Sequence, residues 1–232
     1  LNINLLSIDD TYVFNESYQI DRLSTLMKIL TVGSGIFVMI ASSKYIKIIN
    51  ISKIEYPVLI LSSILGMMIM ISSNDLIVFY MGLELQSLAL YVLASFNRDN
   101  LLSSESGLKY FILSALSSGL LLYGCSLVYG FSGSTNFIQI SETSNDAYYS
   151  VTFGLVFILV GLAFKISAVP FHMWAPDVYQ GSPTSVTLFF SILPKIAALV
   201  VFIRFLYSPF INMIDQWQSI IIFLSIASML FG

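Results

Sequence analysis

Cysteine and histidine are almost absent from this chain of 232 residues, which holds one of each, Cys125 and His172. A single cysteine excludes an internal disulfide and a thiolate metal cluster, and a single histidine leaves no pair of imidazoles for haem or zinc. No G-x-G-x-x-G fingerprint follows a strand, so no dinucleotide site is predicted. We therefore expect no cofactor and no metal on this chain, and we interpret Cys125 as a small packed residue.

Charged side chains are scarce as well, at 10% of the residues against about 25% in a typical soluble domain. Hydrophobic residues make up 57% of the chain, and its mean hydropathy is +0.87. These values indicate an integral membrane protein that contacts a lipid bilayer. We predict no nucleic-acid partner, because the formal net charge is only −3 and the basic residues form no patch.

Apolar runs of about 20 residues predict an all-α, polytopic bundle of about seven to eight transmembrane helices over residues 23–232. Residues 1–22 are polar and acidic, so we expect them to lie outside the bilayer. Pro57 opens the second run, at a position favourable for the first turn of a helix. The predicted helices are Leu23–Ser43, Pro57–Ser73, Leu76–Phe96, Leu108–Gly130, Val151–Val169 with a short continuation Phe171–Tyr179, Thr184–Tyr207 and Trp217–Gly232.

Lysine and arginine mark the loops on the cytoplasmic or matrix side of a membrane. They fall after the first and third predicted helices, whereas the amino-terminal segment and the loop after the fourth helix are acidic. We therefore predict that residues 1–22 lie on the periplasmic or intermembrane side. The deciding residues are Lys44, Lys47, Lys53, Arg98 and Lys109 on the basic side, and Asp9, Asp10, Glu16, Asp21, Glu142 and Asp146 on the acidic side.

Lys165 and Lys195 lie near the middle of two long apolar stretches, GLVFILVGLAFKISAVPFHMW and TLFFSILPKIAALVVFIRF. A lysine at bilayer depth is costly and usually faces a bundle interior or a water-filled path. Pro170 follows the first lysine and Pro194 precedes the second, and neither proline can donate to the carbonyl four residues earlier. We therefore predict helix breaks at both prolines, with freed carbonyls that protein or water must satisfy. This arrangement indicates an ion path.

Glu84 lies close to the middle of a third stretch, DLIVFYMGLELQSLALYVLAS. An isolated carboxylate at that depth would be protonated, so we predict that Lys165 is its partner. A buried lysine that alternately gains and loses a carboxylate binds and releases a proton, which makes Glu84, Lys165 and Lys195 the candidate proton-transfer residues. The alternatives are a structural ion pair that fixes helix register and, for the lysines, snorkelling toward the headgroups.

Three other side chains are candidates for a proton relay or an access route. Glu105 and Lys109 stand four residues apart, a spacing typical of a surface ion pair on a helix, and their alternative role is to line a proton entrance. His172 and Asp177 flank Trp174, which indicates residues at the membrane interface. A proton relay through His172 is the alternative.

Four segments of the chain resemble a known family. Together they are similar to subunit 2 of NADH:ubiquinone oxidoreductase, respiratory complex I, and to its bacterial counterpart of the subunit N type. The resemblance covers nearly the whole chain from about Asp21. The segments are Phe164–Thr184 (FKISAVPFHMWAPDVYQGSPT), Met81–Leu88 (MGLELQSL), Gly107–Gly130 (GLKYFILSALSSGLLLYGCSLVYG) and Leu193–Leu199 (LPKIAAL).

The resemblance implies an antiporter-like subunit of a membrane arm, which passes protons while NADH is oxidised and quinone is reduced elsewhere in the complex. Glu84, Lys165 and Lys195 match the family's buried carboxylate and lysines, and residues 57–207 match the first of two inverted repeats. The resemblance also implies partners among the other membrane-arm subunits and no redox cofactor on this chain.

The family has further helices before Leu23 and after Gly232, so we expect a bundle that is incomplete at both ends. Either the gene is split and a second chain supplies the missing C-terminal helices, or this sequence is a piece of a longer one; we favour the split gene. The residue usage, rich in Ile, Phe, Tyr, Asn, Lys and Ser, is typical of an AT-rich genome. We therefore expect the mitochondrial inner membrane, with a bacterial plasma membrane as the alternative.

Two other functions stay open at this point. A subunit of a multi-subunit Na⁺/H⁺ antiporter would share the buried Glu and Lys arrangement. A structural scaffold of the membrane arm, without pumping of its own, predicts that Lys165→Ala leaves coupled pumping untouched.

Overall fold

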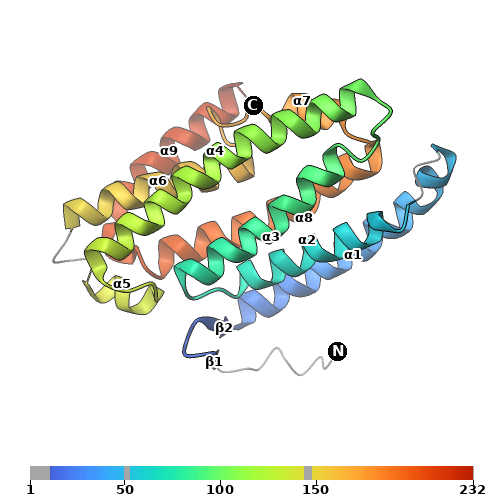
Figure 1. Cartoon of the computed structure of the whole chain (residues 1–232). Helices are drawn as coiled ribbons and strands as arrows, with labels where there is room; N and C mark the ends of the chain where they lie inside the picture. The colour runs from blue at the N-terminus through green and yellow to red at the C-terminus, as the bar shows by residue number, and fades with distance from the viewer. Residues whose placement is uncertain (1–10, 50–52, 144–147, 232) are drawn as a thin grey trace.

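The computed structural model describes residues 11–49, 53–143 and 148–231. Within these residues the chain is a helix bundle with a short two-stranded sheet at its amino-terminal end (Figure 1). The elements are β1 (Thr11–Val13), β2 (Tyr18–Ile20), α1 (Arg22–Ile48), α2 (Glu55–Ile71), α3 (Leu76–Ala94), α4 (Leu101–Ser132), α5 (Phe137–Thr143), α6 (Tyr148–Ile166), α7 (Ala175–Gly181), α8 (Thr184–Tyr207), a 3-10 turn (Ile211–Met213) and α9 (Ile214–Phe231).

Six of the described helices are long and apolar enough to cross a bilayer, and α2 is a shorter apolar helix. This confirms the predicted all-α, multi-pass membrane fold. The largest difference from the predicted bounds is at α4, which begins at Leu101 instead of Leu108. Asn100 explains this start, because its side-chain oxygen accepts the Leu102 N–H at 3.0 Å and caps a polar first turn that the apolar pattern does not reveal.

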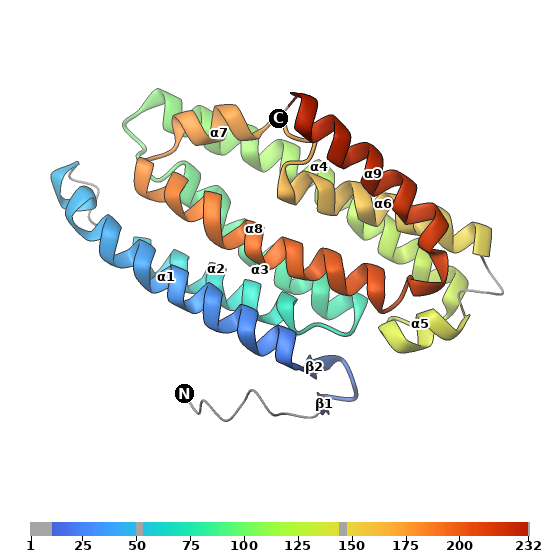
Figure 2. The ribbon, with the colours of Figure 1, turned by 180° about the vertical axis from the view of Figure 1, so that it is seen from behind.

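α8 lies at the centre of the bundle, where it contacts α1, α2, α3, α6 and α7 (Figure 2). Around it, α2 packs on α3, and α4 packs on α6. α9 lies on the outside of α6. The predicted proton-transfer residues Glu84, Lys165 and Lys195 stand on α3, α6 and α8, and α8 contacts both of the other two helices.

Glycines let the helices of each tight pair approach closely. A Cβ on Gly66 of α2 would lie 2.6 Å from the Gln86 nitrogen and 2.7 Å from the Gly82 carbonyl oxygen of α3. Likewise, a Cβ on Gly124 of α4 would lie 2.8 Å from the Gly154 carbonyl oxygen of α6. Close backbone approach at small residues is typical of membrane helix pairs. These contacts fix the position of α3 along α2 and of α6 along α4.

The amino-terminal segment forms a hairpin that the sequence analysis did not predict. β1 pairs antiparallel with β2, and the turn residues Phe14–Glu16 have φ of 56°, 54° and 63°. Residues other than glycine seldom adopt this left-handed region, so the turn has no strong sequence signal. The Gln19 N–H donates to the Ser72 carbonyl at 2.8 Å, which attaches the hairpin to the loop between α2 and α3.

Arg204, near the end of α8, ties the bundle to the start of α1. Its Nη2 donates to both Asp21 carboxylate oxygens at 2.9 Å, and its Nη1 donates to Gln19 Oε1 at 2.7 Å. Asp21 also caps α1, because its carboxylate accepts the Ser24 N–H at 2.8 Å. Burial raises the pKa of the Asp21 carboxyl, but the hydrogen bond with Ser24 and the Arg204 guanidinium outweigh it, so the pKa lies below its ordinary value of 3.8.

We expect the contribution of Asp21 to stability to be lost in acid. A carboxyl with a lower pKa in the folded than in the unfolded chain stabilises the fold above the unfolded value, and this contribution disappears as the pH falls through the folded value. Below about pH 4, the thermal unfolding midpoint of the detergent-solubilised protein should therefore fall more steeply for wild type than for Asp21→Asn. Asparagine retains the helix cap but not the charge. Parallel curves for the two proteins would contradict this expectation.

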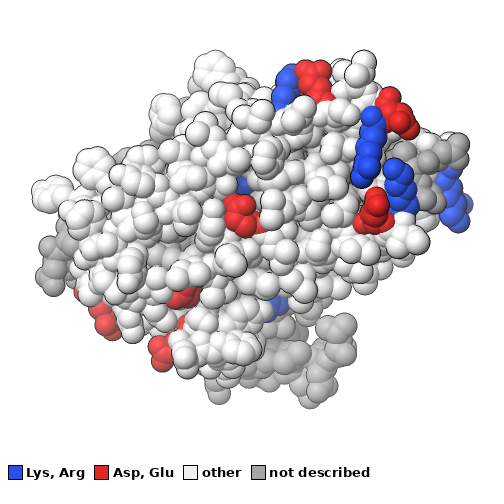
Figure 3. Space-filling view, in the orientation of Figure 1, with Lys and Arg blue, Asp and Glu red and all other residues white. Residues whose placement is uncertain are grey.

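Basic side chains gather at one end of the molecule, where acidic ones lie among them, and the other end carries acidic side chains without basic neighbours (Figure 3). In Figure 3 the blue side chains cluster at the right, over the end of α1 and the start of α4, whereas the red ones at the lower left stand without blue neighbours. Surface cavities bring Lys47, Lys53 and Arg98 to the same end. The asymmetry read from the sequence is therefore present in the fold, and its orientation in the membrane stays a prediction. Asp9, Asp10 and Asp146 lie outside the described residues.

Candidate functional site

Helix α6 is interrupted at Ser167, three residues before Pro170. α6 ends at Ile166, and Ser167 is in the left-handed region with φ 61°. The Ser167 N–H donates to the carbonyl three residues earlier at 3.1 Å, and the Ala168 N–H donates to the carbonyl five residues earlier at 2.9 Å. These two bonds form the Schellman ending of a helix. The predicted break is present, but the proline alone does not cause it.

The segment after the break also corrects the prediction. Residues 167–174 form turns, so the short helix is α7, Ala175–Gly181, and not Phe171–Tyr179. Pro176 stands in the first turn of α7. A proline at this position loses no helical hydrogen bond, because the first N–H groups of a helix have no partner within it.

Lys195 satisfies the carbonyl that the break leaves free. Its Nζ donates to the Ile166 carbonyl oxygen at 2.6 Å and to Ser167 Oγ at 2.5 Å. Pro170 cannot donate to this same carbonyl, so the prediction that protein satisfies it is confirmed. Trp174 supports the arrangement, because its indole N–H donates to another carbonyl of the last turn of α6 at 3.0 Å. A cation at the carbonyl end of a helix is favoured by the helix dipole.

Pro194 does not break its helix, which corrects the second predicted break. α8 runs without interruption from Thr184 to Tyr207, with Pro194 buried inside it. A membrane helix tolerates an internal proline where other helices pack around it, as they do around α8. Lys195 therefore stands on a continuous helix, opposite the break of α6.

Lys165 is buried in the last turn of α6, with 8% of its surface exposed. Its Nζ donates to Ser87 Oγ of α3 at 2.9 Å and to Ser114 Oγ of α4 at 2.7 Å. Ser114 Oγ also accepts the hydroxyl of Tyr91 at 2.8 Å. The amine therefore joins three helices through hydroxyl groups. Because a hydroxyl both donates and accepts, these groups can pass a proton to or from the amine.

Glu84 does not form the predicted ion pair with Lys165. None of the ion pairs among the described residues includes Glu84, and its Oε1 is buried without a hydrogen-bond partner. Ser87 takes its place at the amine, one turn further along α3 and about 4.5 Å along the helix axis. Lys165 nevertheless lies within electrostatic range of the carboxylate. A buried carboxylate oxygen without a hydrogen-bond partner is unusual in a folded protein.

Glu105 and Lys109 form the predicted surface pair, at 2.8 Å, and Asp177 joins them at 2.7 Å from the same Nζ. The three side chains are about half exposed, at 58%, 44% and 52%, so solvent screens both pairs and they contribute little to stability. Lys109 connects α4 to α7. The sequence analysis missed Asp177 as a partner, because the two helices are far apart in the chain.

His172 lies in the turn between α6 and α7, and its Nδ1 is buried without a hydrogen-bond partner. Its roles at the membrane interface or in a relay stay predictions. Cys125 is buried, as predicted for a packed residue. Among the described residues, no three His, Cys, Asp or Glu side chains lie together in a way that could hold a metal ion.

The serines that hold the lysines were not found from the sequence. Ser87 follows Glu84 by three residues on one helix face, which the segment MGLELQSL does encode. Ser114 lies in the segment Gly107–Gly130, but nothing there distinguishes it from the other serines, and it reaches the site only because α4 packs on α6. Ser167 gives no signal of its left-handed backbone, since glycine is the usual residue at that position.

Substitutions of Ser167 separate its backbone role from its side-chain role. Both Ser167→Gly and Ser167→Ala remove the oxygen to which Lys195 donates, but only glycine adopts a positive φ without strain. We expect the glycine variant to be more stable than the alanine variant by about 1–2 kcal/mol, measured by thermal unfolding of the solubilised protein. Equal stability of the two variants would show that the left-handed residue does not fix the break.

Residues 73–232 match the family described as NADH:quinone oxidoreductase/Mrp antiporter, TM. The chain belongs to this family. The matched segment runs from the start of α3 to the end of α9, so it holds Glu84, Lys165 and Lys195.

Curated relatives are similar over nearly all of this chain. NADH-quinone oxidoreductase subunit N of Pelagibacter ubique is 77% identical over 220 residues, which are 95% of this chain and 47% of that protein. Subunit N of Rhodospirillum rubrum is 54% identical over 215 residues, 91% of this chain and 44% of that protein. The chain therefore spans about half the length of these relatives.

Solved structures confirm the predicted antiporter-like bundle. A chain of respiratory complex I from Thermus thermophilus with bound Aureothin has a TM-score of 0.71 and 32% identity, over 84% of this chain and 42% of that chain. A chain of the Mrp complex from Dietzia sp. has a TM-score of 0.70 and 25% identity, over 83% of this chain and 36% of that chain.

Proposed function

We propose that this chain forms part of a proton-translocating subunit in the membrane arm of NADH:quinone oxidoreductase, with NADH oxidation and quinone reduction carried out by other subunits. The observation that carries the proposal is Lys165, a buried lysine at a helix break, held by two hydroxyls and within electrostatic range of Glu84. The relatives named as subunit N support the choice of complex.

In this proposal Lys165 is the proton carrier. The charged amine donates to Ser87 and Ser114, and after it gives up its proton it can accept one from the Ser114 hydroxyl. Glu84, without a partner of its own at Oε1, is the acceptor next to it. Lys195 is a second carrier by resemblance, and its contacts with Ile166 and Ser167 support a further role in holding the break.

A subunit of a Na⁺/H⁺ antiporter is the second candidate. The family description includes the Mrp antiporter, and the Dietzia chain has nearly the same TM-score as the Thermus chain. Identity of 77% to a subunit N, against 25% to the Mrp chain, favours complex I. The pumping-free scaffold is addressed by the Lys165 variant in the Discussion.

The proposed partners are the other membrane-arm subunits. The relatives named above are bacterial, which favours a bacterial plasma membrane over the mitochondrial inner membrane. Residues 1–22 on the periplasmic side and an inverted repeat over 57–207 belong to the same proposal. A second chain that supplies further C-terminal helices stays a prediction.

Mass spectrometry of the native, detergent-solubilised assembly tests this proposal. We expect the chain together with NADH-oxidising and quinone-reducing subunits, and the peptides will show whether the further helices of the relatives are on this polypeptide or on another. Recovery of the chain with antiporter subunits only would overturn the complex I assignment in favour of the exchanger.

A further inference from the structure

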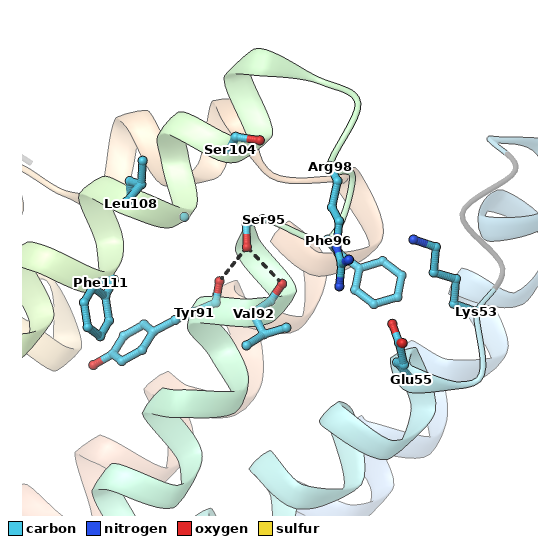
Figure 4. Close-up of a pocket in the computed structure, with 11 residues that line it drawn as sticks. Lys53, Glu55, Tyr91, Val92, Ser95, Phe96, Arg98, Ser104, Leu108 and Phe111 are labelled. Carbon is cyan, nitrogen blue, oxygen red and sulfur yellow. Dashed lines mark hydrogen bonds between the residues drawn. The ribbon is translucent and has the colours of Figure 1, made fainter.

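A cavity of about 430 Å³ lies where the end of α3 meets the starts of α2 and α4. Three charged side chains line one part of it, Arg98 after α3, Lys53 before α2 and Glu55 on α2. Figure 4 shows their charged groups directed toward a common space beside the Phe96 ring. None of the ion pairs and side-chain hydrogen bonds among the described residues includes any of the three. Two cations and one carboxylate are therefore available to a ligand.

The charged part of the cavity lies at the depth of lipid headgroups. α3 has 19 residues. At a rise of 1.5 Å per residue its length is about 29 Å, which is close to the roughly 30 Å of the hydrocarbon core of a bilayer. A helix of this length crosses the core and ends at its boundary. Arg98, four residues after the end of α3, therefore stands outside the hydrocarbon, and Val92 stands just inside it.

The wall of the cavity changes from apolar to polar toward this boundary. Around the end of α3 it carries Val92, Ser95 and then Arg98. On α4, which runs in the opposite direction, it carries Leu108 and then Ser104. Residues three or four apart lie on one face of a helix, so both helices show the same succession to the cavity. Apolar side chain, hydroxyl and charge follow one another in the order of acyl chain, ester and headgroup in a phospholipid.

The apolar part of the cavity faces out of the bundle. Val92, Leu108 and Phe111 are all exposed, although they stand on helices that are apolar enough to cross a membrane. Phe96, in contrast, is buried and packs on the Tyr56 ring at 5.5 Å, which closes the cavity toward α2. An acyl chain can therefore enter from the surrounding lipid. The volume lies within the range of about 300–1,000 Å³ that is usual for ligand pockets.

We propose that this cavity binds a zwitterionic phospholipid whose headgroup carries a phosphate and a primary ammonium, the chemistry of phosphatidylethanolamine. Arg98 and Lys53 hold the phosphate, since both residue types bind phosphate oxygens with charge-assisted hydrogen bonds. Glu55 accepts from the ammonium, and one acyl chain lies along Val92 and Phe111. A phospholipid without an amine would leave the Glu55 carboxylate beside the phosphate without a partner, and a free phosphate would leave the apolar wall uncovered. Binding of this lipid does not require proton transport by the chain.

Photo-crosslinking in the native assembly tests the site. The purified assembly is depleted of lipid in detergent and mixed with vesicles of equal parts phosphatidylethanolamine and phosphatidylglycerol, one of which carries a photoactivatable diazirine in its acyl chain. We expect the ethanolamine probe to label the peptides that contain Val92, Leu108 or Phe111. Labelling by this probe should exceed labelling by the glycerol probe by about fivefold, the effect of one charge at a membrane surface.

Arg98→Gln and Lys53→Gln test the phosphate contacts. Each variant removes one cation, so we expect labelling by the ethanolamine probe, normalised to assembled protein, to fall by about fivefold. Lys44→Gln is the matched control, because Lys44 is an exposed lysine at the same end of the molecule that is not part of the cavity wall. Its labelling should equal that of the wild type. Undiminished labelling of both Arg98→Gln and Lys53→Gln would overturn the phosphate site.

Glu55→Gln tests the contact with the ammonium. Glutamine keeps the shape of the side chain and removes its charge, so we expect the two probes to label this variant equally. Asp99→Asn is the control, because Asp99 is an exposed acid at the same end that does not line the cavity, and it should keep the preference for the ethanolamine probe. Equal labelling of the wild type by both probes, or a preference for the glycerol probe, would overturn the assignment. Absence of labelling by either probe would show that another subunit covers the cavity and would overturn the lipid site.

Discussion

Replacement of Lys165 by methionine is expected to stop proton transport by the complex, while NADH oxidation by an artificial acceptor continues. Methionine matches the length of the lysine stem but has no group that binds a proton. Moving a charge past Ser87 and Ser114 without the amine would cost at least several kcal/mol at bilayer depth. Since each 1.36 kcal/mol is a factor of ten in rate, we expect a loss of about a hundredfold or more.

The measurement is NADH-driven proton uptake by inverted vesicles, normalised to the amount of assembled complex. Lys28→Met is the matched control, because Lys28 is a partly buried lysine on a membrane helix whose amine donates to the Tyr18 hydroxyl at 2.7 Å, away from the site. Wild-type pumping by Lys165→Met would establish the scaffold alternative and would rule out Lys165 as a carrier.

Alanine at Gly66 is expected to displace α3 and to deplete the chain from the assembled complex. The new Cβ would meet two backbone atoms of α3, at 2.6 and 2.7 Å, and backbone atoms cannot move aside as the end of a flexible side chain can. Overpacking of this kind typically costs about 1–3 kcal/mol. α3 also carries Glu84 and Ser87, so any protein that does assemble should pump poorly.

The measurements are the yield of intact complex and its thermal unfolding midpoint. Gly33→Ala is the control, because Gly33 also lies inside a membrane helix, and a Cβ there has no atom within 4 Å to meet. Alanine favours a helix over glycine by about 1 kcal/mol, so the control should be neutral or slightly stabilised. A similar loss in both variants would mean that helix packing at Gly66 is not the cause.

The helices were predictable because their signal is the length of an apolar run, which depends on no other part of the chain. The ends of the helices were less predictable than their presence. Asn100 extends α4 because it caps an earlier first turn. Ser167 ends α6 in a left-handed backbone conformation, which the residue types of the segment do not predict. The hairpin before α1 was missed for the same reason, since its turn uses left-handed residues that are not glycine.

The residues of the candidate site were predictable where a charged residue interrupts a long apolar run. Glu84, Lys165 and Lys195 stand out because a charge in an apolar run is rare. Their contacts were not predictable, because serines are frequent in this chain and only the packing of α3, α4 and α6 selects two of them for Lys165. The expected pair of Glu84 and Lys165 was wrong because the sequence gives the depth of each side chain to within about a helical turn, whereas an ion pair requires about 4 Å.

The ion pair between Asp21 and Arg204 also sets an order of assembly. Its two residues are 183 positions apart. At synthesis rates of about 5–20 residues per second, Arg204 is made about 10–40 s after Asp21. During that interval α1 and the hairpin have no anchor on α8, so α1 enters the membrane before α8, one of the two helices on which it packs, exists. The contact between α1 and α8 must therefore wait until α8 has been inserted, and α1 reaches its final place long after it has been made.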